Sequence, residues 1–253
     1  MLSRRWLLFG LAVAVLAMGA VLLGEWQFNR LEEREQRNEW TRINLEADPA
    51  PVEDVLSTDR AVEPDQEWLR VRATGRYDEA STVVLRYQTR DGASGVDVVT
   101  PLVTDDGTGL LVDRGWVGTD NTGDIPTDLP PAPPGEVEVV GWVRADSDGR
   151  GTEVTDRSTR AISTEAIAET VDYPLYVGFV DAESETPEPE TAPVRTELPD
   201  LGEGPHLFYG IQWWFFGALA IFGFGYLAWD ERRGRRRVTE PGSDPRPAGS
   251  SRP

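Results

Sequence analysis

The chain has 253 residues, no cysteine, a single histidine and a formal net charge of −19. These counts exclude a disulfide framework, thiolate catalysis, cysteine-bound zinc or copper, and any metal site that needs several histidines. The acidic excess lies in the middle of the chain and both ends are basic, which argues against nucleic-acid binding, because that requires a basic face.

An uncharged apolar run over residues 6–23 follows Arg4 and Arg5. At about 1.5 Å per residue, a helix of this length spans roughly 27 Å and can cross a bilayer. A cleaved signal peptide is the alternative, but the run is longer than a typical signal core and its small-residue site lies inside the run. We therefore expect a cytoplasmic N-terminus, residues 1–5, and a retained transmembrane helix, residues 6–23.

Residues 24–181 are expected to form an extracytoplasmic domain that opens with a juxtamembrane helix, which a Pro-rich stretch at 48–51 would end. Alternating β-branched and aromatic residues predict strands near 67–72, 81–89, 95–104, 110–117, 137–144 and 173–180. Ser163 is a suitable N-cap for a short helix, and Pro101 indicates an edge or a bulge in its strand. Because the turns are short, we expect antiparallel hairpins and an α+β, mainly antiparallel-β fold.

The Pro- and Glu-rich residues 182–204 predict a linker outside the folded domain. A second apolar segment, residues 205–229, predicts another transmembrane helix, and a basic, disordered cytoplasmic tail, residues 230–253, is expected to follow it. Arginines flank the outer ends of both apolar segments, so the positive-inside rule puts both termini in the cytoplasm and the central domain outside. The expected protein is therefore a multi-pass protein of the plasma membrane with two transmembrane α-helices, surrounded by lipid.

His206 is the most informative residue for chemistry. Pro205 suits the first helical position, which puts His206 in the first turn of the second apolar helix, where the helix dipole favours the neutral, metal-binding imidazole. Tyr209, Gly210 and Trp213 follow at helical spacing on the same face, with Gly217 one turn further on. A flat macrocycle would fit against such a face. Alternatively, His206 is an interfacial histidine and the glycines serve helix packing.

Two further stretches contain candidate binding residues, each with a simpler interpretation. Gln27 and Arg30 lie three residues apart on one helical side and would pair with an anionic group, or form an ordinary solvated face. Arg114, which a Gly-Trp pair follows, would meet an anionic ligand or pair with an acid of its own domain. No isolated pair of acids, phosphate loop or nucleophile elbow is evident.

These stretches resemble three motifs of the surfeit locus protein family, in the same order and with the same two-span layout. The first motif, LGxWQxxR, is matched by Leu23, Gly24, Trp26, Gln27 and Arg30. The second, TP(L/F)…G…LVNRGWVP, is matched by Thr100, Pro101, Leu102, Leu111, Val112, Arg114, Gly115, Trp116 and Val117, with Asp113 in place of the usual Asn. The third, HLxYxxxW, is matched by His206, Leu207, Tyr209 and Trp213.

The resemblance implies a bacterial assembly factor for haem-copper cytochrome c oxidase in respiratory chain biogenesis, and not a conventional enzyme. It implies that the protein binds haem a, stably or transiently, and delivers it to the catalytic subunit of the oxidase. A haem a synthesis enzyme is a further partner compatible with this role. The implied site consists of His206 as an axial ligand of the haem iron, Trp213 and Tyr209 beside it, and Arg30 or Arg114 at a propionate.

The alternative is a cofactor-free membrane scaffold that stabilises the oxidase catalytic subunit while another factor delivers haem. An unrelated membrane-anchored sensor or enzyme is a third hypothesis, and the residue counts leave it little chemistry. A copper chaperone is excluded by composition, because it would need cysteines or several His or Met ligands, and the chain has one His and two Met.

Overall fold

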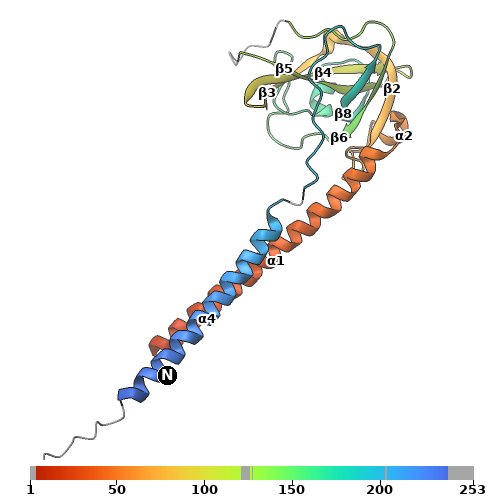
Figure 1. Cartoon of the computed structure of the whole chain (residues 1–253). Coiled ribbons are helices and arrows are strands. Elements are labelled where there is room, and N and C mark those ends of the chain that lie inside the picture. Colours follow the sequence, from red (N-terminus) through yellow and green to blue (C-terminus); the bar gives the residue numbers. More distant parts are fainter. Residues whose placement is uncertain (1–3, 121–125, 127, 203, 239–253) are drawn as a thin grey trace, which may run out of the picture. The chain divides into compact units, whose positions relative to one another are not determined.

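The computed structural model describes residues 4–120, 126, 128–202 and 204–238, with side chains described up to residue 233. It separates into two compact units, residues 36–202 and residues 1–35 with 203–253. The elements, labelled in Figure 1 where there is room, are α1 (Arg4–Glu46), β1 (Ala50–Pro51), α2 (Val52–Val55), β2 (Arg70–Tyr77), η1 (Glu79–Ser81), β3 (Val83–Arg90), β4 (Ala93–Thr104), β5 (Gly109–Gly118), β6 (Val137–Arg144), β7 (Ser158–Thr159), α3 (Thr164–Ala168), β8 (Leu175–Thr186) and α4 (His206–Val238).

One sheet, in the order β1-β2-β6-β8-β5-β4-β3-β7, forms the β domain. An additional pairing of β2 with β4 closes β2, β6, β8, β5 and β4 into a barrel. β4 pairs with β3 up to Val99 and with β2 from Leu102 onward. Pro101 lies at this change of partner. A residue without an N–H is tolerated there because neither neighbouring strand needs that donor.

The sheet is mixed, so the expected mainly antiparallel fold is wrong. β1 pairs with β2, β3 with β7 and β5 with β8 in parallel. Parallel neighbours need a long crossover, and here β6, β7 and α3 lie between β5 and β8 in the chain. Short turns in a sequence reveal hairpins only, and a pairing across such a distance leaves no local signal.

Strict alternation along the strands builds two apolar clusters. Leu110 and Val112 of β5 point into the barrel, together with Leu102 and Val180, whereas Leu111 points to the opposite face. There Leu111 packs under Ile167 of α3, a helix that Ser163 caps as predicted by accepting a hydrogen bond from the Ala166 N–H. The alternation that predicted the strands therefore also assigns each side chain to its cluster.

The first part of the predicted linker, residues 182–204, is folded instead. β8 continues to Thr186, with Ala182 and Glu185 buried. Further on, Val194 exchanges two backbone hydrogen bonds with Trp116 of β5, at 2.8 and 2.9 Å. The Pro and Glu content predicts a linker, but Glu185 has the charged partners Arg114 and Arg195 inside the domain, so the strand can continue.

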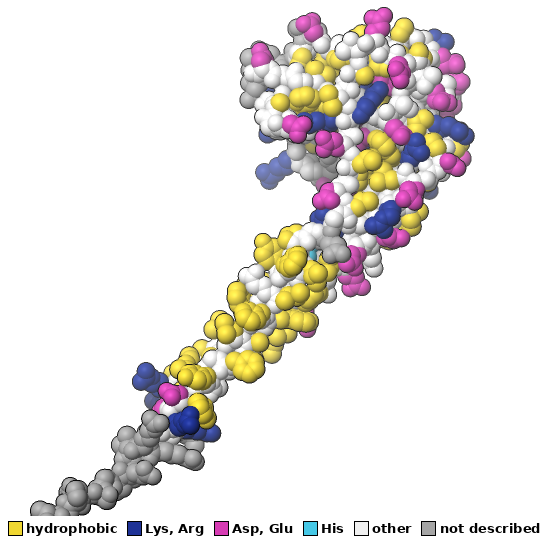
Figure 2. All heavy atoms as spheres, viewed as in Figure 1, with side chains coloured by type: hydrophobic (Ala, Val, Ile, Leu, Met, Phe, Trp, Pro, Cys, Tyr) yellow, Lys and Arg dark blue, Asp and Glu magenta, His cyan; other side chains and the backbone are white. Residues whose placement is uncertain are grey.

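Within the residues that the structure describes, two helices, α1 and α4, are long and apolar enough to cross a membrane, judged by length and composition. Their apolar residues are mostly exposed, for example Phe208, Phe222 and Leu8. Figure 2 shows these side chains covering the paired helices, whereas charged side chains gather over the β domain. α1 continues unbroken to Glu46, just before the predicted stop at Asp48. α4 continues to Val238, so residues 230–238 of the expected disordered tail are helical instead.

Candidate functional site

α1 and α4 pack side by side and antiparallel within their unit, as Figure 1 shows. Gly10 of α1 lies against Phe224 of α4, whereas Phe28, further along α1, lies against Gly210, nearer the start of α4. The pairing therefore brings residues near position 27 of α1 to the first turn of α4. This register places the first and third motifs together.

The first residue of α4 is His206, and it contacts α1 directly. Its Nδ1 lies 2.9 Å from the side-chain oxygen Oε1 of Gln27. The Tyr209 N–H donates to the carbonyl of Pro205 at 3.1 Å, which closes the first helical turn as predicted from Pro205. His206 is half-buried, and within the described part of the chain its imidazole has one hydrogen bond, through Nδ1.

In this region, the space beside each of three glycines is occupied by a side chain of the neighbouring helix. A Cβ on Gly210 would meet the ring of Phe28 at 2.9 Å, and one on Gly217 would meet the Ala20 side chain at 3.2 Å. Gly24 of the first motif is the tightest, since a Cβ there would lie 2.3 Å from the indole of Trp214. The helix-packing interpretation is therefore confirmed, and the predicted gap for a flat macrocycle at Gly210 and Gly217 is absent.

Tyr209 and Trp213 lie on α4 one and two turns after His206. Tyr209 is exposed and Trp213 is half-buried, with its ring edge-on to Phe216 at 6.1 Å. Both present apolar ring surface at the start of α4. Both are aromatic residues of the third motif, and helical spacing puts Tyr209 on the same side of α4 as His206 and Trp213 one turn beyond Tyr209.

Arg30 lies on α1 one turn after Gln27 and has local partners. It forms an ion pair of 2.7 Å with Glu33, in which both side chains are half exposed, and its guanidinium lies over the ring of Trp26 at 5.9 Å. Exposed pairs of this kind contribute about 0–1 kcal/mol and exchange readily. Arg30 can therefore leave Glu33 for a stronger anion.

Arg114 lies in the other unit, inside the β domain, where it pairs with an acid. Its Nε donates to Glu185 at 2.9 Å, and the two side chains are 1% and 0% exposed. Tyr77 and Arg195 also donate to this carboxylate, each at 2.7 Å. Burial raises the pKa of Glu185, but the hydrogen bond from Tyr77, the charge of Arg114 and the hydrogen bonds from Arg195 and Arg114 outweigh it and hold that pKa below its ordinary value.

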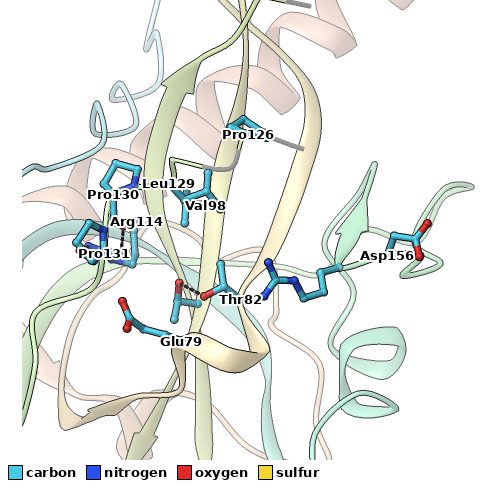
Figure 3. A pocket seen from close by; sticks show the side chains of 11 residues that line it. Glu79, Thr82, Val98, Arg114, Pro126, Leu129, Pro130, Pro131 and Asp156 are labelled. Carbon is cyan, nitrogen blue, oxygen red and sulfur yellow. Dashed lines mark hydrogen bonds between the residues drawn. The ribbon is translucent and has the colours of Figure 1, made fainter. Parts of the chain in front are cut away.

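The other nitrogens of Arg114 bind backbone carbonyls at the edge of a pocket. They donate to Pro130 and Pro131 at 3.0 and 3.1 Å, as Figure 3 shows. The pocket has a volume of about 480 Å³ and is also lined by Glu79, Thr82, Val98, Thr100, Pro126, Leu129, Asp156 and Arg157. Arg114 therefore pairs with an acid of its own domain, the simpler of its two interpretations, and its remaining nitrogens bind backbone carbonyls.

Three buried aspartates were missed by the sequence analysis. Asp97 of β4, Asp113 of β5 and Asp181 of β8 lie on neighbouring strands, and Asp113 and Asp181 are directly paired. Burial raises the pKa of Asp97 to about 6 and raises that of Asp113 well above its ordinary value. The available signal for Asp97 and Asp113 was a single acid within a mostly apolar strand, whereas Asp181 is followed by Glu183 and Glu185 in β8 and has no such signal. Among the described residues, no group of His, Cys, Asp or Glu has the arrangement of a metal site.

The comparisons with known proteins fit these motifs. A model of the SURF1 family matches residues 14–218, a range that contains Gln27, Arg114 and His206. Uncharacterized SURF1-like proteins of Mycobacterium bovis and Mycobacterium tuberculosis are 31% identical over 252 residues, which cover 97% of this chain and 91% of each relative. The chain belongs to the SURF1 family.

The SURF1 family is an assembly-factor family, generally linked to cytochrome oxidase, and is not a known enzyme class. The three motifs of this family member serve different parts of the structure. Gly24 and Gln27 connect α1 to α4, and the second motif builds the interior of the β domain. His206, Tyr209, Trp213 and Arg30 lie in one unit, and Arg114 lies in the other.

Proposed function

We propose that this SURF1-family protein is a plasma-membrane assembly factor for haem-copper cytochrome c oxidase, and that His206 presents a ligand to the iron of haem a for the catalytic subunit. One observation carries the proposal. The single histidine of the chain lies half-buried at the start of α4 with Nδ1 engaged, so Nε2 is left to bind a metal.

The residues present fit one axial bond to a haem iron. A neutral imidazole with one engaged nitrogen is the usual state of a metal-binding histidine. Tyr209 and Trp213 would offer ring surface, and Arg30 would exchange Glu33 for a propionate. Bound there, haem a would be cargo whose redox chemistry is used in the oxidase. α1 and α4 would span the membrane with both termini in the cytoplasm, as the basic residues at their outer ends indicate.

The test is haem binding by the full chain in detergent. Wild type with haem a is expected to show the optical spectrum of a histidine-ligated haem, and His206→Ala is expected to lose it. Gln212→Ala, at an exposed polar position of the same helix, is the matched control and should retain the spectrum. If His206→Ala keeps both spectrum and stoichiometry, His206 is not the ligand.

A second candidate is the cofactor-free scaffold, which the packed glycines and the internal partners of Arg114 favour. It predicts that the protein co-purifies with the oxidase catalytic subunit from cells that lack haem a, and that His206→Ala leaves this association unchanged. Haem binding without such association would favour the first candidate, whereas a deletion strain with full oxidase activity would contradict both.

A further inference from the structure

Gln27 is the only described residue that is hydrogen-bonded to the imidazole of His206, and the contact joins two different helices. Its position is determined by packing on both sides. Gly24, one turn earlier on α1, receives the indole of Trp214, and Phe28, the next residue, fills the space beside Gly210. The rings of Phe28 and Trp214 also meet at 4.8 Å. Gln27 is therefore held opposite His206 by the neighbours that set the helix register.

The chemistry of the contact decides which imidazole nitrogen carries the proton. The atom of Gln27 that faces Nδ1 is the amide oxygen, which accepts hydrogen bonds and cannot donate them. Nδ1 must therefore be an N–H. In the neutral ring, the lone pair that can bind a metal then lies on Nε2.

We propose that Gln27 is a positioning residue that holds His206 in the Nδ1–H tautomer and so makes Nε2 its metal-binding nitrogen. The tautomer follows from the contact alone, whereas the role of Nε2 toward haem iron rests on the proposed function. Hydrogen bonds of this kind orient histidine ligands, and their loss typically weakens metal binding about 10–100-fold.

A neutral partner suits this place better than a carboxylate. The contact is half-buried between two helices, and Phe28, the next residue on α1, packs its ring against Trp214, so a negative charge there would lose part of its hydration. An amide also orients the ring without strengthening the iron–nitrogen bond as a carboxylate does. This combination fits a ligand that has to release its cargo.

The single histidine makes a direct test available. In full-length protein labelled with ¹⁵N-histidine in detergent micelles, the two nitrogen resonances at alkaline pH report the tautomer without any haem. Wild type is expected to show mainly Nδ1–H. Gln27→Leu, which keeps the size and removes the acceptor, is expected to shift the ring toward Nε2–H, and Gln27→Glu is expected to retain Nδ1–H.

Asn29→Leu is the matched control, because Asn29 is an exposed amide residue on the same helix, and it should leave the resonances of wild type unchanged. A wild-type spectrum dominated by Nε2–H, or a Gln27→Leu spectrum identical to wild type, would overturn the inference. Retention of Nδ1–H in Gln27→Glu shows that the helix pair is intact and that the acceptor is what matters.

Haem a titration separates this inference from the proposed function. Gln27→Leu is expected to bind haem a about 10–100-fold more weakly than wild type. Gln27→Glu should restore binding with a higher iron–imidazole stretching frequency, because the carboxylate makes the imidazole more basic. If wild type shows the Nδ1–H tautomer but binds no haem a, the proposed function fails and the tautomer assignment stands. If His206→Ala abolishes binding while Gln27→Leu binds as wild type does, the role of Gln27 fails and the proposed function stands.

Discussion

The guanidinium of Arg114 and the carboxylate of Glu185 form an ion pair of 2.9 Å in the interior of the β domain, with Arg114 Nε as the donor. Removing one partner of a buried pair leaves an uncompensated charge. We expect Arg114→Met to lower the free energy of unfolding by about 3 kcal/mol, near the lower end for such pairs because Arg195 still binds Glu185. Chemical denaturation of the full chain in detergent, followed by near-UV circular dichroism, measures this effect.

Arg70→Met is the matched control, because Arg70 pairs with Glu183 at 2.8 Å in a partly exposed position of the same domain. Its loss should cost less than about 1 kcal/mol. If both substitutions lower the free energy of unfolding equally, burial is not the reason that Arg114 stabilises the domain.

Gly115, between Arg114 and Trp116, combines a left-handed backbone with a close neighbour. Its φ is +123°, and a Cβ would lie 2.4 Å from the Val194 carbonyl oxygen. Gly107 has a φ of +85° and open space around it. Gly107→Ala should cost about 1–3 kcal/mol from backbone strain, and Gly115→Ala should cost more because Val194 must also move. Protease cleavage near residues 187–193 should accelerate in Gly115→Ala alone, and equal cleavage in both variants would contradict this explanation.

The three buried aspartates predict a pH dependence. Burial is the main cause of each raised pKa, and the neighbouring aspartates add to it for Asp97 and Asp113. Arg90, 3.3 Å from Asp97, and Arg144, 2.8 Å from Asp181, oppose it. A carboxyl whose pKa is raised in the folded state binds more protons folded than unfolded, so its contribution to stability is lost as pH rises from its ordinary pKa through the raised one.

Asp113→Asn isolates this effect, since its side-chain oxygen can still accept the bond from the Gly115 N–H. We expect the variant to be more stable than wild type at pH 8 and the difference to shrink as the pH falls toward 4. Denaturation at both pH values measures it. If the difference in stability between the variant and wild type is the same at both pH values, ionisation of Asp113 is not its cause.

Ala20 and Gly217 test the helix register in a chain without cysteine. A Cβ on Gly217 would lie 3.2 Å from the Ala20 side chain, close to the roughly 3.5–4.5 Å between Cβ atoms in disulfides. Oxidation of Ala20→Cys/Gly217→Cys should cross-link the chain almost completely. Val21→Cys/Gly217→Cys, displaced by one residue to an exposed position, should cross-link little, and the reverse result would mean a different register.

The parts of the molecule that depend on local pattern were predictable from the sequence. The apolar run after Arg5, the strands around Leu111 and Val139, and the cap at Ser163 all follow from periodicity or from a single side chain near its own backbone. The parallel pairing of β5 with β8 and the burial of Glu185 were not, because each depends on residues distant in the chain.

The same division holds for the candidate site. His206 was identifiable because it is unique, and Gln27 because it belongs to a motif. Their contact joins residues 179 positions apart, and no local pattern encodes such a distance. For Arg114 the local pattern left open an anionic ligand or an acid of the same domain, and it could not identify that acid, because Glu185 lies 71 positions further along the chain.

The binding of residues 194 and 195 to β5 has a consequence for truncated forms of the chain. Glu185 receives its last partner from Arg195, ten residues further along the chain, and α4 begins at His206. The last internal partner of the β domain is therefore encoded just before the second apolar helix. A chain that ended before Arg195 would contain every strand of the barrel but would leave the buried carboxylate of Glu185 with one guanidinium fewer, so we expect its β domain to be less stable.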